Sequence, residues 1–202
     1  MPHRSKIRIH LPPYIRRLKR GPQVILPKDA GIILTYSGVG KNSRVLEAGT
    51  GSGYLTRMLA NFCKEVITYE RDDRFYKLAK KNLSDVKNVK IKHQDIRDGI
   101  RERNLDLIVL DMPGSHEVIP LTYRALKPGG CLVGYNPNME QVKQFVLKGR
   151  ETGFVDDITV EVLTREILVR EYGVRPASIG ITHTAYLSFL WKPKDDSSRS
   201  KE

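Results

Sequence analysis

The stretch that decides the fold is Arg44-Val-Leu-Glu-Ala-Gly-Thr-Gly-Ser-Gly-Tyr-Leu-Thr56. A short apolar run leads into three alternating glycines, and a helical pattern follows from Tyr54 to about Cys63. Glycines between a strand and a helix let the backbone turn tightly and approach a ligand closely. The stretch therefore predicts a ligand-binding loop at the end of a strand, and the alternative is a turn with a structural role only.

Short apolar runs and helical periodicity alternate after this loop. We expect strands at 44–47, 66–70, 89–93, 105–111 and 131–135. Helices are expected at 54–63, around 75–83, through 123–126 and at 139–152, with a turn at 127–130. Two long strands are expected at 158–170 and 184–191, joined by a loop at 173–180. Strands that alternate with helices imply a doubly wound, mostly parallel α/β sheet. The last two strands would add an antiparallel C-terminal hairpin and bring the sheet to seven strands.

Length and composition fit one globular domain with short extensions. The chain has 202 residues, of which 40% are hydrophobic and 29% charged, and no apolar run is long enough to span a membrane. Only Cys63 and Cys131 occur, both in apolar stretches, which favours core thiols in a reducing cytoplasm over a disulfide or a metal site. We expect a cytoplasmic protein without a bound metal.

Positive charge is concentrated at the N-terminus. The 35 Lys and Arg residues exceed the 23 Asp and Glu residues, giving a net charge of +12, and residues 1–20 carry seven bases and no acid. Such an arm is typical of a nucleic-acid contact, although a merely solubilising tail has the same composition. We divide the chain into a basic arm (1–20), a domain (21–192) and a polar tail (193–202), and the prolines predict that residues 1–28 form an extended lead-in.

Acidic residues close successive predicted strands. Glu70 ends the second strand, 17 residues after Gly53, where a doubly wound fold places a carboxylate on a ribose diol. Asp95 follows the third strand, where an acceptor can meet the exocyclic amine of an adenine. Glu47 precedes the glycines, and an acid there suits a cationic ligand and repels a phosphate. These positions describe a nucleoside-binding edge.

The glycine spacing resembles the first motif of class I S-adenosylmethionine-dependent methyltransferases, which have a Rossmann-like fold. Further segments resemble the tRNA (adenine-N1)-methyltransferase family that acts on T-loop adenines. They are Arg20-Gly-Pro-Gln23 through Asp29, Leu110-Asp-Met-Pro113, Tyr135-Asn-Pro137 through Val142, Arg175-Pro176 and His183-Thr-Ala-Tyr186. The resemblance covers roughly residues 20–192. Members usually carry a small N-terminal β-domain, whereas only the basic arm precedes Gly21 here, and the aromatic that commonly follows the Asp-x-Pro motif is absent.

The resemblance implies S-adenosyl-L-methionine as cofactor, tRNA as substrate and a homo-oligomer, a tetramer in this family. The implied cofactor-binding residues are Gln23, Glu47, Gly49, Gly51, Ser52, Gly53, Tyr54, Leu55, Glu70, Arg71, Phe75, Asp95, Ile96 and Asp111. Methyl transfer to N1 of adenine at position 58, with position 57 as a second target, needs mainly alignment of the N1 lone pair with the methyl–sulfur bond. N1 lies on the Watson–Crick edge, so the base must be flipped out.

Asp111 is the expected catalytic residue, because a carboxylate at the end of the fourth strand can accept a hydrogen bond from the adenine 6-amino group. It would also stabilise the positive charge that develops on the ring; the alternative role is a strand cap. Tyr135 could border the target base or belong to the core, and His183 is expected to have a structural or RNA-contact role. Arg16, Arg17, Lys19 and Arg20 are the expected tRNA contacts of the arm, which would replace part of the RNA-holding role of the absent domain.

Three other functions fit parts of the pattern. Protein isoaspartyl methyltransferases have a similar first motif, but their upstream segment normally carries a hydroxyl residue, and Gly21 to Asp29 contains no Ser or Thr. Small-molecule methyltransferases of the precorrin type share the size and fold. A non-catalytic RNA-binding subunit would not need an intact glycine loop together with Glu70, Asp95 and Asp111.

Overall fold

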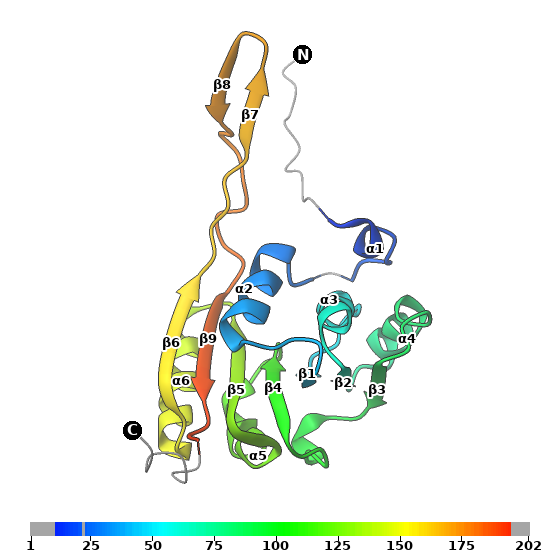
Figure 1. Cartoon of the computed structure of the whole chain (residues 1–202), viewed down its shortest axis with the longest axis vertical. Helices are drawn as coiled ribbons and strands as arrows, with labels where there is room; N and C mark the ends of the chain where they lie inside the picture. The colour runs from blue at the N-terminus through cyan, green and yellow to red at the C-terminus, as the bar shows by residue number, and fades with distance from the viewer. Residues whose placement is uncertain (1–10, 22, 195–202) are drawn as a thin grey trace.

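The central sheet is mostly parallel, as the alternation of strands and helices predicts. In the computed structural model, which describes residues 11–21 and 23–194, seven strands lie in the order β3-β2-β1-β4-β5-β9-β6 (Figure 1). The first five are parallel, and β9 runs antiparallel between β5 and β6. Their bounds are β1 (Arg44–Ala48), β2 (Glu65–Glu70), β3 (Val89–His93), β4 (Leu105–Leu110), β5 (Leu126–Asn136), β6 (Val155–Glu161) and β9 (Tyr186–Trp191). The predicted seven-stranded, doubly wound α/β fold is confirmed.

Helices begin and end where local chemistry favours it. Within the described ranges they are α1 (Pro13–Arg16), α2 (Pro27–Ser37), α3 (Tyr54–Phe62), α4 (Asp73–Asn82), α5 (Ile119–Ala125) and α6 (Met139–Thr152), with 3₁₀ turns η1 (Ile96–Asp98) and η2 (Ser115–Val118). The Asp72 carboxylate accepts from the main-chain N–H groups of Arg74 and Phe75, and so caps α4. Gly153, with a φ of 104°, ends α6 in a left-handed conformation that favours glycine.

Successive residues of the central strands face opposite layers of helices. Val45 and Leu107 belong to a core cluster with residues of α1, α2 and α3, whereas Leu46 and Ile108 belong to a second cluster with residues of α5 and α6. All four side chains are fully buried, which explains the continuous apolar runs of β1 and β4. Two helical layers therefore cover the sheet, as Figure 1 shows.

The direction in which strands are added reverses between β1 and β4. The chain passes outward from β1 to β2 and β3, and then returns to place β4 on the other side of β1. In open sheets of this kind, ligands bind in the crevice beyond the carboxyl ends of the strands at this reversal. The glycine loop leaves β1 at that point, so the fold itself selects the position of the site.

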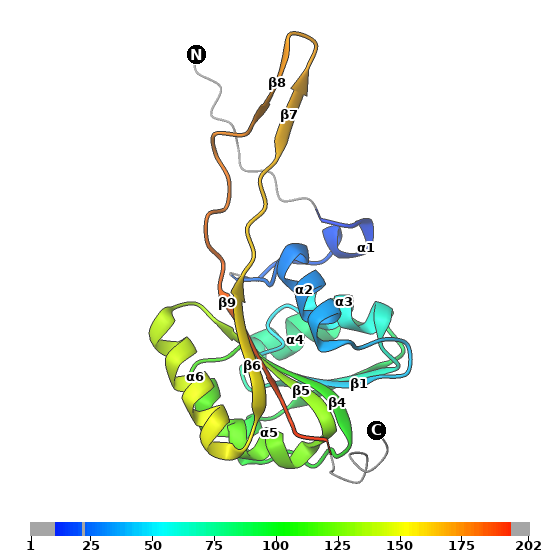
Figure 2. The ribbon, with the colours of Figure 1, turned by 60° about the vertical axis from the view of Figure 1, so that its left-hand side comes forward.

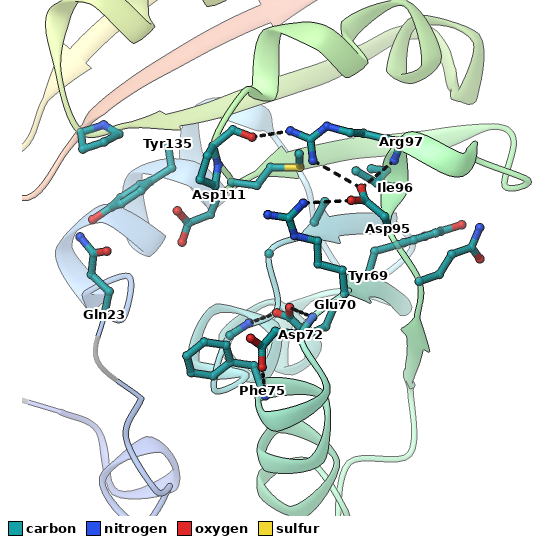
Figure 3. Close-up of a pocket in the computed structure, with 18 of the residues that line it drawn as sticks. Gln23, Tyr69, Glu70, Asp72, Phe75, Asp95, Ile96, Arg97, Asp111 and Tyr135 are labelled. Carbon is teal, nitrogen blue, oxygen red and sulfur yellow. Dashed lines mark hydrogen bonds and ion pairs between the residues drawn. The ribbon is translucent and has the colours of Figure 1, made fainter.

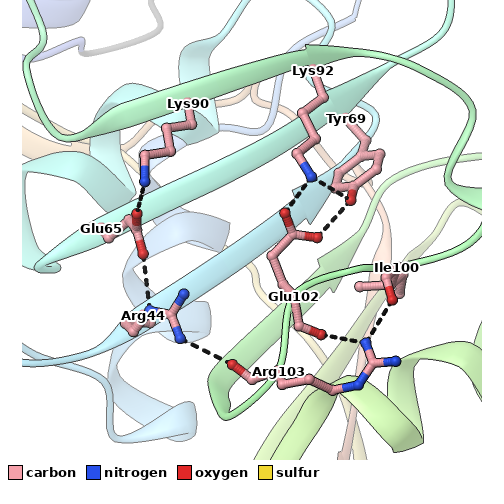
Figure 4. A network of polar contacts seen from close by, with 8 residues as sticks. All are labelled: Arg44, Glu65, Tyr69, Lys90, Lys92, Ile100, Glu102 and Arg103. Carbon is pink, nitrogen blue, oxygen red and sulfur yellow. Dashed lines mark hydrogen bonds and ion pairs between the residues drawn. The ribbon is translucent and has the colours of Figure 1, made fainter.

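Ion pairs tie the β3 edge of the sheet to its neighbours (Figure 4). The Glu65 carboxylate accepts from Arg44 Nε at 2.9 Å and from Lys90 Nζ at 2.6 Å, which links β1, β2 and β3. Lys92 pairs with Glu102, whose other oxygen accepts from the Tyr69 hydroxyl at 2.6 Å. Lysines on an edge strand also discourage pairing with another chain.

A long arm leaves the sheet between β6 and β9. It carries a separate two-stranded sheet of β7 (Ile167–Arg170) and β8 (Gly173–Pro176), which projects beyond the body in both views (Figures 1 and 2). The sequence predicts one long strand over 158–170 and a loop over 173–180, and both predictions are wrong in detail. The strand begins earlier and breaks after Glu161, because the residues beyond it leave the sheet and have no neighbouring strand there.

Three further local expectations differ from the structure. The lead-in before residue 28 is not wholly extended, because α1 forms there and α2 begins at Pro27. α2 itself was not predicted, although Pro27 at its first turn and Gly38 after its end are ordinary helix boundary signals. The expected turn at 127–130 lies within β5, where a register shift opposite β4 accommodates the glycines. Residues 1–10 of the basic arm and 195–202 of the tail lie outside the described residues.

Cys63 and Cys131 are buried and unpaired, and burial raises the pKa of both thiols, to about 11 and about 12. They are small core residues that stay protonated at neutral pH. Among residues 11–21 and 23–194, no helix has the length and apolar character needed to cross a membrane.

Candidate active site

A pocket of about 430 Å³ opens at the carboxyl ends of the parallel strands (Figure 3). Its size is in the range of small-molecule sites. The first wall, here called the β1–β3 wall, contains Ala48, Gly49, Gly51, Tyr69, Glu70, Arg71, Asp72, Phe75, Gln94, Asp95, Ile96 and Arg97. The second, the β4–β5 wall, contains Asp111, Met112, Pro113, Tyr135, Pro137 and Gln141, with Gln23 completing the lining.

Gly49 lets β1 approach the end of β4 closely. Its φ is 94°, and a Cβ built there would lie 2.0 Å from the main-chain oxygen of Asp111. The Asp111 N–H donates to the Ala48 carbonyl at 2.9 Å, which joins the two strand ends. Any side chain at position 49 would force the walls apart, so this glycine is required by the fold at the pocket.

Glu70 is held by main-chain donors from both sides. Its Oε2 accepts from the Gly51 N–H and its Oε1 from the Asp72 N–H, each at 2.8 Å. The side chain is 7% exposed and still lines the pocket. Each carboxylate oxygen has a second lone pair available. Glu70 can therefore accept hydrogen bonds from a ligand diol without giving up its position.

Asp95 is part of a cluster with two arginines (Figure 3). It accepts from the Arg97 N–H at 3.0 Å and pairs with Arg71 at 3.2 Å. Burial alone would raise the pKa of Asp95, but the Arg97 amide and the arginine charges outweigh it and lower the pKa. Arg97 also donates to the Pro113 carbonyl at 2.7 Å, and so ties the β1–β3 wall to the loop after β4.

Asp111 differs from the other pocket carboxylates. Burial, and then the charge of Glu70, raise the pKa of Asp111 to about 7. Within the described part of the chain, no group donates a hydrogen bond to its carboxylate, and Figure 3 shows that carboxylate facing the space between the walls. It is an acceptor with an open face, poised near neutral pH.

Tyr135 and Gln23 lie opposite the β1–β3 wall in Figure 3. Burial raises the pKa of Tyr135, and the charges of Asp29 and Asp111 add to the effect, so the phenol stays protonated. Asp29 is fully buried in α2 and is joined to Lys28 at 2.7 Å and to Thr184 at 3.0 Å. This network fixes the start of α2 beside the β4–β5 wall.

Glu47 does not line the pocket. It is 1% exposed beneath the glycine loop, where its Oε2 accepts from Thr56 at 2.5 Å and from Thr68 at 3.1 Å. Burial raises the pKa of Glu47 to about 8 despite these hydrogen bonds, so the group is mostly neutral at pH 7. In this structure it supports the loop from below.

Four more residues of the predicted cofactor set lie behind the pocket surface. Ser52 and Gly53 end the glycine loop, Tyr54 and Leu55 begin α3, and none of the four is among the lining residues. Gly53 has a φ of 79° and packs against Leu83, while the Tyr54 hydroxyl donates to the Leu18 carbonyl at 3.1 Å. The structure therefore places Gln23, Gly49, Gly51, Glu70, Arg71, Phe75, Asp95, Ile96, Asp111 and Tyr135 together in the pocket.

The predicted tRNA contacts lie outside the pocket. Arg16, Arg17, Lys19 and Arg20 are exposed, next to the buried Ile15 and Leu18, which pack into the core. His183 lies behind the β4–β5 wall, with Nδ1 2.6 Å from Glu161 Oε1 and Nε2 2.9 Å from the Pro137 carbonyl oxygen. Glu161 and Pro137 raise the pKa of His183, and in the protonated ring both nitrogens donate, so it braces Pro137.

Sequence reasoning missed several lining residues. They are Ala48, Tyr69, Asp72, Gln94, Arg97, Met112, Pro113, Pro137 and Gln141. Most come one to three residues from a predicted site residue, at the end of a parallel strand. The rule that ligands bind beyond these ends would have included them, whereas Gln141, at the start of α6, carries no such signal. Across the described ranges, no group of three or more His, Cys, Asp or Glu residues is arranged to hold a metal ion.

Comparison with known proteins identifies relatives across most of the chain. The family model described as tRNA methyltransferase complex GCD14 subunit matches residues 14–187. The tRNA (adenine(57)-N(1)/adenine(58)-N(1))-methyltransferase TrmI of Methanocaldococcus jannaschii is 37% identical, over 93% of this chain and 78% of the relative.

Solved structures agree with these matches. The tRNA (m1A58) methyltransferase TrmI of Aquifex aeolicus superposes with a TM-score of 0.84 at 32% identity, over 90% of this chain and 75% of that one. A structure described as a SAM-dependent O-methyltransferase of Thermotoga maritima gives a TM-score of 0.85 at 31% identity, over 90% and 72%. A pocket at the β1/β4 reversal, a glycine loop and these matches lead to one conclusion: the chain belongs to the GCD14/TrmI family of tRNA methyltransferases, which has the class I S-adenosylmethionine-dependent methyltransferase fold.

Proposed function

We propose that the protein transfers a methyl group from S-adenosylmethionine to N1 of an adenine in the tRNA T-loop, at position 58. The observation that carries the proposal is the open carboxylate of Asp111 beside the glycine loop, which has no hydrogen-bond donor among residues 11–21 and 23–194. The family membership supports the same substrate, because relatives that match most of this chain are named for this reaction.

The residues present fit the cofactor. Gly51 leaves open space beside the backbone, Gly49 lets the strand ends close together beneath it, and Glu70 keeps free lone pairs for a ribose diol. Asp95 provides a second acceptor of low pKa for an adenine amine. When bound, S-adenosylmethionine supplies an electrophilic methyl group on a positively charged sulfur, and the acidic lining favours that charge.

Asp111 is the catalytic residue of the proposal. Its carboxylate accepts a hydrogen bond from the 6-amino group of the target adenine, which holds N1 in line for attack. As N1 gains the methyl group, positive charge spreads over the ring, and the ionised carboxylate stabilises it at short range. Tyr135, buried and neutral, forms the side of the base pocket facing Asp111. No general base is required, because N1 carries no proton at neutral pH.

The target base must leave its stack to reach Asp111, which costs a few kcal/mol in such enzymes. Contacts to the tRNA backbone offset this cost, and we assign them to Arg16, Arg17, Lys19 and Arg20, all of which are exposed. Deleting the segment before Gly21 should lower tRNA affinity and flatten its dependence on salt concentration. A deletion protein with unchanged tRNA affinity would return the segment to a solubilising role.

A homo-oligomer, a tetramer by family resemblance, is a further part of the proposal. The arm of β7 and β8 exposes Ile167, Val169, Tyr172 and Val174 to between 52% and 87%, and an isolated two-stranded hairpin is marginally stable in water. A second copy of the chain would cover these side chains. Light scattering should give a multiple of 23.0 kDa, and Tyr172→Asp with Val174→Asp should give the monomer mass. A cytoplasmic location stays a prediction.

The decisive experiment incubates the protein with unmodified tRNA transcript and S-adenosylmethionine. We expect 1-methyladenosine by nucleoside mass spectrometry and a primer-extension stop at position 58, and a transcript with guanosine at 58 shows whether position 57 is also modified. Methylation of an isoaspartyl peptide and not of tRNA would refute the proposal. Asp111→Asn provides the inactive control.

A further inference from the structure

Asn82, the last residue of α4, connects two segments that are far apart in the sequence. Its Oδ1 accepts from the Lys19 N–H at 3.1 Å, and its Nδ2 donates to the Lys19 carbonyl at 2.8 Å. The same Nδ2 donates to the Ser52 carbonyl in the glycine loop at 2.8 Å. One side chain that is 8% exposed therefore satisfies both main-chain polar groups of Lys19 and holds the glycine loop.

Two neighbouring contacts anchor the same N-terminal segment. The Tyr54 hydroxyl donates to the Leu18 carbonyl, and Leu18 itself is 8% exposed. Arg57 donates to both oxygens of Asp85, at 2.6 and 2.8 Å, and Asp85 accepts from the exposed Arg17 at 2.7 Å. These hydrogen bonds hold the pKa of Asp85 well below its usual range. α1 accordingly lies against α3 (Figure 1).

The anchored segment leads directly to the pocket. A Cβ built on Gly21 would lie 3.3 Å from the Phe75 ring and 3.4 Å from Ser52 Oγ, so the chain passes close over both residues. Phe75 lines the pocket, and Gln23, two residues after Gly21, lines it from the other side. Gly21, through its contact with Phe75, and Gln23, as a lining residue, therefore place this segment at the pocket rim.

The main chain and the side chain of Lys19 lie in different environments. Its main chain is fixed by Asn82, whereas its side chain is exposed together with those of Arg16, Arg17 and Arg20. A cationic segment fixed through its backbone presents its charges to a polyanion at a lower entropic cost than a free tail. The Asn82 amide is thus hydrogen-bonded both to this cationic segment and to the glycine loop.

We propose that Asn82 is a positioning residue that couples the cofactor site to the tRNA-binding segment. A ligand that fixes the glycine loop strengthens the docking of residues 17–21, and tRNA bound to that segment strengthens the cofactor site by the same factor. This inference rests on the proposed function for the identity of the polyanion. The coupling itself rests on the contacts of Asn82, with the Tyr54 hydroxyl as a second anchor.

The test measures the affinity for tRNA in the presence and absence of S-adenosylhomocysteine, which cannot donate a methyl group. We expect the wild type to bind tRNA about fivefold or more tightly with the ligand present, within the usual range of coupling between sites. Asn82→Ala should reduce this ratio to nearly one and raise the KM for tRNA more than it lowers kcat. Asn88→Ala is the matched control, because Asn88 also donates to two carbonyls, those of Ala60 and Cys63, away from the segment.

A second readout needs no tRNA. Trypsin cleaves after Arg16, Arg17, Lys19 and Arg20, and S-adenosylhomocysteine should slow this cleavage in the wild type and in Asn88→Ala but not in Asn82→Ala. Equal protection in all three proteins, or an unchanged affinity ratio, would overturn the inference. If Asn82→Ala does not fold, Tyr54→Phe decides, because it removes one anchor and should give an intermediate ratio.

The two proposals fail in different ways. Absence of methylation on tRNA, with ligand-dependent protection intact, would overturn the proposed function and leave the coupling of the segment to the glycine loop standing. Methylation of tRNA by Asn82→Ala with wild-type KM and an unchanged affinity ratio would overturn the coupling and leave the proposed function standing.

Discussion

The two walls of the pocket use their acids in opposite ways. In the β1–β3 wall, Glu70 accepts two main-chain hydrogen bonds and Asp95 pairs with Arg71 and Arg97. In the β4–β5 wall, the Asp111 carboxylate receives no hydrogen bond from the described residues, and burial raises its pKa to about 7. The acids of the first wall are held in place by protein donors, whereas the acceptor of the second wall is open to a ligand.

In the proposed mechanism, this difference separates cofactor binding from catalysis along one edge of the sheet. Carboxylates held by fixed donors lose little freedom when a ligand binds, which favours affinity. A carboxylate that is desolvated and unpartnered interacts most strongly with charge that appears only in the transition state. Variants of the two walls should therefore affect different kinetic constants.

Asp111→Ala should have the largest effect. We expect kcat to fall by roughly 10²- to 10³-fold, the usual cost of removing one electrostatic stabiliser from an active site. The Kd for S-adenosylmethionine, measured by calorimetry, should change far less. Near-normal turnover with unchanged tRNA binding would reduce Asp111 to a strand cap. Asp106→Asn is the control on the same strand, because Asp106 lies at the opposite end of β4 and accepts from the Arg44 N–H.

Glu70→Gln should have the next largest effect, on affinity instead of rate. Hydrogen bonds to a charged acceptor are worth about 1.5–3 kcal/mol, so we expect the cofactor Kd to rise roughly ten- to hundredfold. The kcat at saturating cofactor should stay within a few-fold of wild type. Glu102→Gln is the matched control, since Glu102 pairs with Tyr69 and Lys92 behind the wall. A variant with normal affinity and a low kcat would erase the distinction between the walls.

The sequence predicts the β1–β3 wall better than the rest of the site. Gly49, Gly51, Glu70 and Asp95 follow from local signals, because glycine freedom and residues at strand ends are visible in one dimension. Arg97 and Gln141 reach the pocket only through the packing of η1 and α6, which no local pattern encodes. The same holds for α2, whose boundary signals are ordinary but whose apolar pattern is weak.

Glu47 shows why a correct motif can still mislead about a role. The motif places an acid directly before the glycines, which predicts contact with a cationic ligand. In the structure, the Glu47 carboxylate is covered by Thr56 from α3 and Thr68 from β2, which both donate hydrogen bonds to it. Whether the side chain faces the pocket or the core depends on that tertiary arrangement.

The pH dependence of the reaction provides a finer test of the β4–β5 wall. The proposed mechanism needs ionised Asp111, whose pKa is about 7 in the free protein, so kcat/KM should rise about tenfold between pH 6 and pH 8. Positive charge bound beside Asp111 lowers its pKa, so kcat at saturation should rise less. Glu70→Gln removes the neighbouring charge that raises this pKa, and should shift the kcat/KM profile to lower pH. A flat profile would show that Asp111 does not titrate in this range.

Glu47→Gln should change catalysis least, and it tests whether the Glu47 carboxyl group is neutral in the folded protein. The pKa of Glu47 is about 8 when folded and about 4.5 when exposed, so the folded chain binds more protons between these values and wild-type stability falls as pH rises from about 4.5 to about 8. The neutral amide keeps an oxygen for Thr56 and Thr68 and abolishes this loss. Thermal unfolding should therefore show a gain in Tm for the variant at pH 8 and little difference at pH 4.5. The opposite order would mean that the Glu47 carboxylate is ionised in the folded protein.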